Sequence, residues 1–344
     1  MLAEIGFSAA FGAFVSLLVC RAVMAAGLMD MAVGARRAHL QPTPTSGGLG
    51  IAVGFALAMM ALSFAPLWRA QAEAESALRL TVTTAVAYAF LGLGFFDDAR
   101  PLGPRVKFVL FAVLSVSGAL AAGVVKALPL SEAMTLELVF PLGLIGSALW
   151  VFTLANAVNF MDGSNGLAMG SVAIGLVALG AIALAAGAPS AAAMALCGAG
   201  ALAGFLFWNF PHGRLFAGDS GALFAGALAA LASLAAIGEG GISPFIPPIL
   251  FFPLLGDVLL TLAWRLSQGR KLFDGHSEHL YQIGLRPGQG HAAVALLYWA
   301  AMAACGGLGY AAAAGWIAPP LALASLALLA LAISAALRKA AAAR

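Results

Sequence analysis

Long apolar stretches repeat along the whole chain, and each matches the thickness of a bilayer's hydrocarbon core. A helix needs about 20 apolar residues to cross that core, and the 344 residues contain about eleven such stretches. Hydrophobic residues make up 62% of the chain and charged residues only 9%, which is too apolar for a soluble domain. The sequence therefore predicts an all-α, polytopic integral membrane helix bundle that forms a single domain over residues 1–344. The expected spans lie at residues 6–28, 47–67, 79–96, 106–125, 138–158, 165–186, 191–209, 220–237, 245–265, 291–312 and 317–337.

The ninth expected span is the irregular one. It contains Pro247, Pro248 and Pro253, so we expect it to be kinked or broken. Asp257 lies within it, and an acid inside a span is functional by default. The structural alternative makes Asp257 a buried partner of Arg265 or a polar contact between helices.

The basic residues predict an orientation. Most Lys and Arg fall in loops that an eleven-span topology places on one side of the membrane. The positive-inside rule makes that side cytoplasmic, with the N-terminus outside and the C-terminus in the cytoplasm. Every Asp also falls on or toward that side, whereas Glu278 is the one Glu that does. We therefore expect the chemistry on the cytoplasmic side.

The stretch NAVNFMDGSNG, residues 156–166, separates the fifth and sixth expected spans. Its Asp-Gly and Asn-Gly pairs are turn signals. Asp162 or Ser164 can cap the helix that follows, so that its free N–H groups point out of the lipid and suit a phosphate. The amides Asn156, Asn159 and Asn165 are candidate substrate-binding groups beside it.

Three further acids lie at the ends of spans. Asp97 and Asp98 end the third span, and adjacent carboxylates repel unless a cation or proton lies between them. Lys107 follows one to three turns into the next helix and can return toward them. Asp219, flanked by glycines, opens the eighth span; a simple N-cap is its structural alternative. Carboxylates beside a phosphate site suit Mg²⁺, which shares its coordination with phosphate oxygens.

Two loops add candidates. The loop from Asp30 to Gly48, which carries Arg36, Arg37, His39 and Thr45, reads as an anion-facing flap or as an ordinary positive-inside loop. The loop at 267–290 carries Arg270, His276 and His279, and the two histidines share a face if the segment is helical. Zinc would need further ligands at matching spacing, so phosphate or substrate binding is the better interpretation.

Taken together, these clusters resemble the polyprenyl-phosphate N-acetylhexosamine-1-phosphate transferases, also called glycosyltransferase family 4. The resemblance rests on five ordered motifs between residues ~30 and ~290. They are PTPTSGG at 42–48, FFDD at 95–98 with Lys107, NAVNFMDGSNG at 156–166, LFAGDSGALFAG at 215–226 and HSEHLYQIG at 276–284. The NFMDG and HxxHLYQ forms are more similar to the O-antigen-initiating, UDP-sugar branch than to the peptidoglycan branch. The chain lacks the HHH run of the latter, and it has Asn165 where many members have a second acid.

The resemblance implies a bundle of ten or eleven helices with a cytoplasmic cleft. It implies transfer of a sugar 1-phosphate from a UDP-N-acetylhexosamine to undecaprenyl phosphate with release of UMP, dependent on Mg²⁺ or Mn²⁺. It also implies a bacterial inner-membrane location, contact with the lipid bilayer, no nucleic acid and a possible homodimer.

The motif matches carry roles to individual residues. Asp97 and Asp98 would handle Mg²⁺ and activate the lipid phosphate, and Asp219 would be a metal ligand. Asn159 and Asp162 would hold the nucleotide-sugar, and Phe216 would stack on uracil. Asn209 and Thr45 would line the nucleotide site. His276 and His279 would contact the diphosphate or the sugar.

Two mechanisms and two rival functions stay open at this stage. Direct attack by the lipid phosphate, with Asp97 or Asp98 taking any proton, competes with a covalent aspartyl intermediate. A cation-coupled transporter would explain Asp257 and the proline-rich ninth span. A membrane scaffold would tolerate Asp219→Asn.

Overall fold

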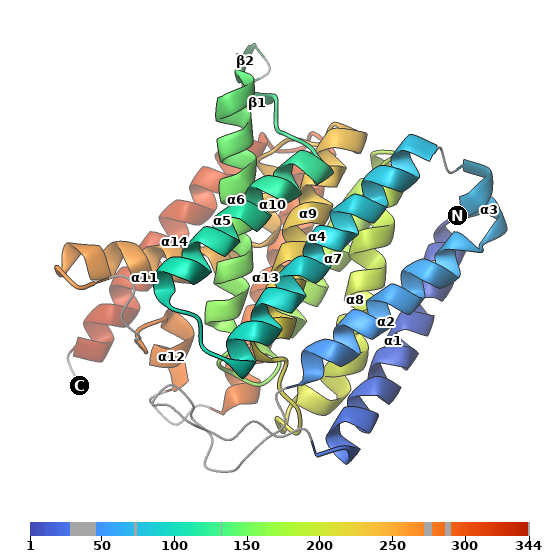
Figure 1. The fold of residues 1–344 in the computed structure, drawn as a ribbon. Coiled ribbons are helices and arrows are strands. Elements are labelled where there is room, and N and C mark those ends of the chain that lie inside the picture. Colours follow the sequence, from blue (N-terminus) through green and yellow to red (C-terminus); the bar gives the residue numbers. More distant parts are fainter. Residues whose placement is uncertain (28–45, 72–73, 132, 272–276, 286–289, 343–344) are drawn as a thin grey trace.

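Helices make up most of the described chain, and the long ones run roughly along a common direction (Figure 1). The computed structural model describes residues 1–27, 46–71, 74–131, 133–271, 277–285 and 290–342. Two predicted site residues, Thr45 and His276, lie outside these ranges, as do Arg36, Arg37 and His39. The long helices are α1 (Leu2–Ala25), α2 (Gly47–Ser63), α4 (Ala74–Ala99), α5 (Pro104–Ala122), α6 (Phe140–Met161), α7 (Leu167–Ala185), α8 (Pro189–Asn209), α9 (Gly218–Gly240), α13 (His291–Ala313) and α14 (Pro319–Ala342).

The expected membrane character is confirmed. Within the described ranges, nine helices are long and apolar enough to cross a bilayer, and α2 is a shorter apolar helix of 17 residues. Together with the interrupted ninth span, they account for the eleven expected positions. The protein is therefore an integral membrane protein built as a helix bundle.

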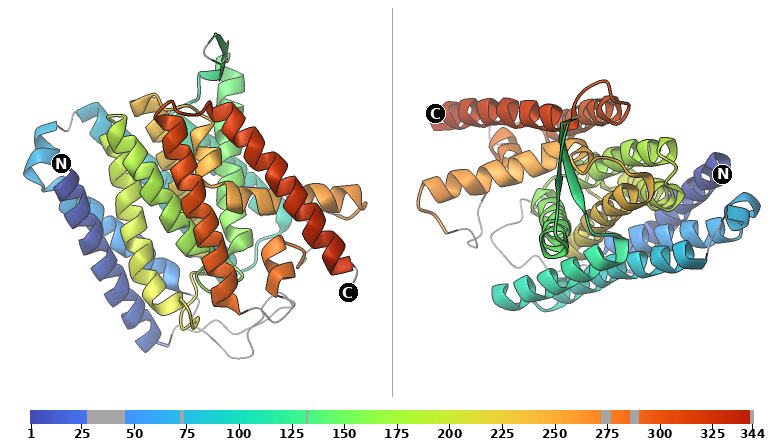
Figure 2. Two further views of the ribbon diagram at one scale, coloured as in Figure 1. Left: turned by 180° about the vertical axis from the view of Figure 1, so that it is seen from behind. Right: turned by 90° about the horizontal axis from the view of Figure 1, so that it is seen from above.

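The ninth span is broken, as its prolines predict. It consists of α10 (Ile246–Leu250) and α11 (Phe252–Ser267), with the break at Phe251. Pro253 has no N–H to donate to the carbonyl of Ile249, so α10 cannot continue through it, whereas proline is tolerated in the first turn of α11. Figure 2 shows that α11 then runs across the bundle instead of along it.

Helix α9 lies in the centre and is buried along most of its length, from Ser220 to Ala236. Small residues let its neighbours come close. A Cβ added to Gly226 would lie 2.8 Å from the Cα of Ala155 on α6, so the two backbones touch. Such small-residue contacts are typical of helix packing in membranes. This arrangement fixes the start of α9, which carries Asp219, against the surrounding helix ends.

The strands were not predicted. β1 (Ala127–Ser131) pairs antiparallel with β2 (Met134–Glu137), with Leu128 opposite Leu136. This short hairpin projects from the upper end of the bundle in Figure 1. The opposite end contains the last turns of α4, α6 and α8 and the first turns of α7, α9 and α13. The short helix α3 (Pro66–Gln71) lies at the same end of the bundle as the hairpin, and α12 (Leu280–Leu285) lies at the opposite end.

Candidate active site

Lys107 joins three helices at the end of the bundle opposite the hairpin. Its ammonium donates to Asp97 Oδ2 at 2.5 Å and to Asp219 Oδ2 at 3.0 Å. The three residues come from the last turn of α4, the first turn of α5 and the first turn of α9. Asp97 Oδ1 also accepts from Leu102 N at 2.8 Å, which fixes the connection between α4 and α5. The expected return of Lys107 toward the carboxylates is what the structure shows.

Asp98 lies against the start of α9. Its two carboxylate oxygens accept from the backbone N–H groups of Asp219 and Ser220, each at 3.2 Å. A carboxylate here satisfies free N–H groups of the helix and interacts favourably with its dipole. Glycine makes the approach possible, because a Cβ on Gly94 would lie 2.5 Å from the backbone N of Ser220. Asp98 thereby holds Asp219 in place beside Lys107.

Helix α2 reaches the same point. Gly47 N donates to Phe216 O at 2.9 Å, and Gly48 N donates to Ala217 O at 3.0 Å. A Cβ on Gly48 would lie 2.5 Å from the backbone N of Gly221. The Phe216 side chain, three residues before Asp219, is half-buried. The close packing explains the paired glycines at 47 and 48.

The α6–α7 turn brings the fourth acid. Asp162 follows the last residue of α6, and the side chain of Asn159 is hydrogen-bonded to the Asp219 carboxylate. Burial raises the pKa of Asp162 well above its ordinary value, and the negative charges of Asp219 and Asp98 raise it further. Asp162 is thus close enough to Asp98 and Asp219 for their charges to act on it, and these two acids lie with Asp97 and Lys107 at the start of α9.

Asn209 and Asn165 tie loops together. Asn209 is 4% exposed; its Oδ1 accepts from Gly166 N at 2.6 Å and its Nδ2 donates to Leu215 O at 2.8 Å. Asn165 Nδ2 donates to Pro211 O at 3.0 Å. Both amides therefore hold the α6–α7 turn against the α8–α9 loop. Asn156 donates to Phe152 O within its own helix at 2.8 Å. Substrate contact by these three amides stays a prediction.

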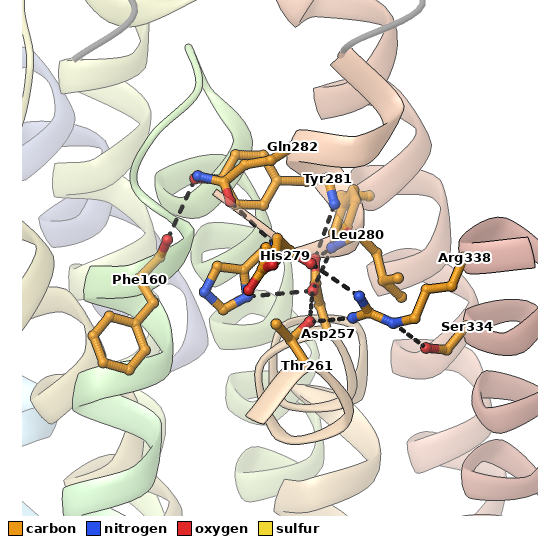
Figure 3. A network of polar contacts seen from close by, with 11 residues as sticks. Phe160, Asp257, Thr261, His279, Leu280, Tyr281, Gln282, Ser334 and Arg338 are labelled. Atoms are coloured by element: carbon orange, nitrogen blue, oxygen red, sulfur yellow. Dashed lines mark hydrogen bonds and ion pairs between the residues drawn. The ribbon is translucent and has the colours of Figure 1, made fainter. Parts of the chain in front are cut away.

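His279, a predicted residue of the last loop, lies in a separate network (Figure 3). His279 is 3% exposed, with Nδ1 at 3.4 Å from Asp257 Oδ1, and its ring stacks with those of Phe160 and Tyr281. Arg270 forms an ion pair with Glu278. The suggested pairing of Asp257 with Arg265 is wrong, because Arg265 also pairs with Glu278.

Tyr281 connects that network to the acids, and sequence reasoning assigned it no role. Its hydroxyl donates to Phe160 O at 3.4 Å. A Cβ on Gly163 would lie 2.2 Å from this hydroxyl, so the glycine after Asp162 makes room for Tyr281. Burial and the nearby Asp257 and Asp162 carboxylates raise the pKa of Tyr281, which keeps it a proton donor. The Asp162-Gly163 pair in the sequence predicts a turn, but it does not predict that Tyr281 packs against this turn.

Comparison with known proteins identifies the family to which this arrangement belongs. The profile of glycosyl transferase family 4 matches residues 79–237. Decaprenyl-phosphate N-acetylglucosaminephosphotransferase from Mycobacterium leprae is 30% identical over 290 residues, which cover 77% of this chain and 72% of that protein. The chain belongs to glycosyl transferase family 4. This confirms the resemblance drawn from the motifs.

Other family members have related names. The probable undecaprenyl-phosphate N-acetylglucosaminyl 1-phosphate transferase of Bacillus subtilis is 26% identical, covering 74% of this chain and 69% of that protein. Phospho-N-acetylmuramoyl-pentapeptide-transferase of Symbiobacterium thermophilum is 30% identical, covering 61% and 66%. The names of these relatives thus describe sugar-phosphate transferases of more than one kind, and two of the three names include a polyprenyl phosphate. The family match spans all four clustered acids and Lys107 but ends before Asp257.

The acidic group suits a hard divalent cation. Within the described ranges, no three His, Cys, Asp or Glu side chains form a ready-made metal site. Mg²⁺ does not require one, because it is usually held by one or two carboxylates and substrate phosphates. The Asp219 side chain is the more open partner of Lys107, at 36% exposed against 14% for Asp97. Asp219, with Asp98 against the same helix start, therefore fits such an ion.

Proposed function

We propose that this protein transfers N-acetylhexosamine 1-phosphate from a UDP-sugar to undecaprenyl phosphate, releasing UMP. The reaction would initiate a lipid-linked cell-envelope glycan such as O-antigen. The observation that carries the proposal is the meeting of four aspartates and Lys107 at one end of a membrane bundle. One reactant is a lipid and the other is water-soluble, so the site has to lie at a membrane surface.

The donor sugar is N-acetylglucosamine in this proposal. The relatives with the largest shared coverage carry that sugar in their names. The muramoyl-pentapeptide relative covers less of the chain. The site would face the cytoplasm of a bacterial plasma membrane, with the N-terminus outside and the C-terminus inside. The basic loops support this orientation.

The proposed chemical step is direct. An oxygen of the lipid phosphate attacks the β-phosphorus of the donor, and the bond from that phosphorus to the bridging oxygen breaks. UMP leaves with that oxygen, and a lipid diphosphate sugar remains. Any proton on the attacking phosphate passes to Asp97 or Asp98. A covalent aspartyl intermediate is the alternative, and donor alone would then label the enzyme.

The residues have distinct proposed roles in this step. Lys107 fixes Asp219 and Asp97 and adds positive charge where two anionic reactants meet. Asp219 and Asp98 would hold Mg²⁺, which when bound neutralises phosphate charge and orients the diphosphate, and Asp162 would help to hold the nucleotide-sugar. Asn159 keeps Asp219 aligned through its side-chain hydrogen bond. Phe216 and Asn209 would lie on the nucleotide side.

The transporter alternative loses one of the features that supported it. It relied on Asp257 as an acid inside a span, but that carboxylate accepts from two backbone N–H groups and a tyrosine hydroxyl. These contacts inside the protein occupy the carboxylate.

Purified protein in detergent tests the proposal directly. It is incubated with undecaprenyl phosphate, Mg²⁺ and a panel of UDP-N-acetylhexosamines, and UMP release is followed. We expect release that needs both the lipid and a UDP-sugar, is fastest with UDP-N-acetylglucosamine and is lost in Asp219→Asn. Glu137→Gln, in the hairpin at the other end, is the matched active control. No release above the Asp219→Asn level with any donor would overturn the proposal.

A further inference from the structure

Asp257 is a buried carboxylate with a complete set of hydrogen-bond donors. It is 3% exposed and lies in the second turn of α11. Its Oδ1 accepts from Leu280 N at 2.7 Å and from the Thr261 hydroxyl at 3.2 Å. Its Oδ2 accepts from Tyr281 N at 3.1 Å and from the Tyr298 hydroxyl at 2.7 Å (Figure 3). A carboxylate has about four acceptor sites, so this one has none left for a substrate.

The carboxylate fixes the start of α12. Two of its four donors are the consecutive backbone N–H groups that open this helix. The Gln282 side chain accepts from His279 N at 3.1 Å and closes the same turn. His279 lies directly before α12 and contacts Asp257 through Nδ1 at 3.4 Å. Asp257 therefore sets where His279 and Tyr281 lie.

Helix α12 in turn packs against the turn that carries Asp162. The Tyr281 hydroxyl donates to Phe160 O, two residues before Asp162, and it occupies the space above Gly163. The His279 ring stacks on the Phe160 ring with centroids 6.1 Å apart. A displacement of α12 would thus release the α6–α7 turn from one side.

The far side of Asp257 is braced by the last two long helices. Tyr298 comes from α13. Arg338, from α14, donates to the Thr261 hydroxyl at 2.9 Å and to Glu278 O at 3.3 Å. Its guanidinium lies over the Trp264 ring, 4.3 Å from the centroid. The network therefore anchors α12 to three helices that bear none of the clustered aspartates.

We propose that Asp257 is a positioning residue of the transferase, which holds the His279–Tyr281 segment against the Asp162 turn. The inference rests on the proposed function, because it assigns Asp162 to the reacting centre. Asparagine at this position offers one acceptor oxygen and turns an NH₂ group toward donors, so α12 would shift. A shift of about 1 Å near reacting groups lowers turnover by up to about 100-fold.

The test measures kcat and the KM of both substrates for four enzymes: wild type, Asp257→Asn, Tyr281→Phe and the double variant. We expect Asp257→Asn to lower kcat by about 10- to 100-fold with each KM within about threefold of wild type. The double variant should turn over about as slowly as Asp257→Asn alone, because both changes release the same contact. Multiplicative losses in the double variant would overturn the inference.

The matched control is Glu4→Gln. Glu4 also accepts from two consecutive backbone N–H groups, those of Leu67 and Trp68 at 2.9 Å each, but at the start of α3. This variant loses the same kind of cap and should keep the wild-type kcat. Loss of activity in Asp257→Asn that only follows the folded fraction, measured by thermal unfolding in detergent, would overturn a positioning role.

A milder variant covers the case in which Asp257→Asn does not fold. Tyr298→Phe removes one hydrogen bond from the carboxylate and should lower kcat about threefold without raising either KM. A wild-type kcat in Tyr298→Phe would then overturn the inference. If wild type is active and the Asp257 variants keep its kcat, only the positioning role of Asp257 is contradicted. If wild type itself is inactive, the proposed function is contradicted too.

Discussion

The ammonium of Lys107 lies 3.0 Å from the carboxylate of Asp219, although 112 residues separate them in sequence. This contact closes the start of α9 onto the start of α5. Lys107 also donates to Asp97, so one cation balances two acids that would otherwise repel each other. The side chains are partly exposed, so the pair is positioned for function more than it is a source of stability.

Replacing Lys107 with methionine should therefore affect turnover more than folding. We expect kcat to fall about 100-fold, because positive charge near the transferred phosphorus is lost and Asp219 loses a positioning partner. Lys126→Met, in the connection before β1, is the matched control. Steady-state kinetics beside a thermal unfolding curve separate the effects. Near-wild-type turnover in the Lys107 variant would remove this residue from the site.

Alanine should have opposite effects on stability at two glycines of α4. A Cβ at Gly94 would meet the backbone of Ser220 at 2.5 Å, where nothing can yield without moving α9. A Cβ at Gly92, half a turn earlier, would meet nothing within 4 Å. Gly94→Ala should lower the melting temperature and activity together, while Gly92→Ala should be neutral or stabilise by about 0.5–1 kcal/mol. Equal melting temperatures for the two variants would contradict the described packing of α4 on α9.

The Asn209 side chain should contribute to the stability of the protein. Alanine there leaves the Gly166 N–H and the Leu215 carbonyl buried without their partner. Each unsatisfied group should lower the free energy of unfolding by about 1–3 kcal/mol. We expect a melting temperature several degrees below wild type. Asn156→Ala is the comparison, because its amide bonds only a carbonyl of its own helix. If the two variants have the same melting temperature, Asn209 does not hold the two loops as described.

Metal removal should stop turnover without unfolding the protein. The proposed ion is held by few carboxylates and by substrate, so a chelator should remove it readily. We expect EDTA to abolish UMP release, Mg²⁺ to restore it and Mn²⁺ to substitute. Mg²⁺ should also raise the melting temperature of wild type but not of Asp219→Asn. Full activity in EDTA would contradict the assignment of the acidic group to a divalent ion.

Much of the architecture could be predicted because it depends on local sequence. Span length, proline content and the Asp-Gly turn predicted the helices, the break before Pro253 and the turn at Asp162. The hairpin at 127–137 was missed, since its strands are short and largely exposed. The contact between Asp257 and the Leu280 N–H was missed because the two residues lie 23 positions apart. Only the direction that α11 takes after the break decides that contact. The amide of Asn209 was assigned to substrate for a similar reason, since its backbone partners depend on how two loops pack.

The most direct test follows the phosphorus atom. Wild type and Asp219→Asn are incubated with undecaprenyl phosphate and UDP-N-acetylglucosamine labelled at the β-phosphorus, and the lipid is extracted. The account predicts label in the lipid fraction of wild type, one equivalent for each UMP released, and none with the variant. Sugar appearing on the lipid without the label, together with UDP in solution, would contradict it.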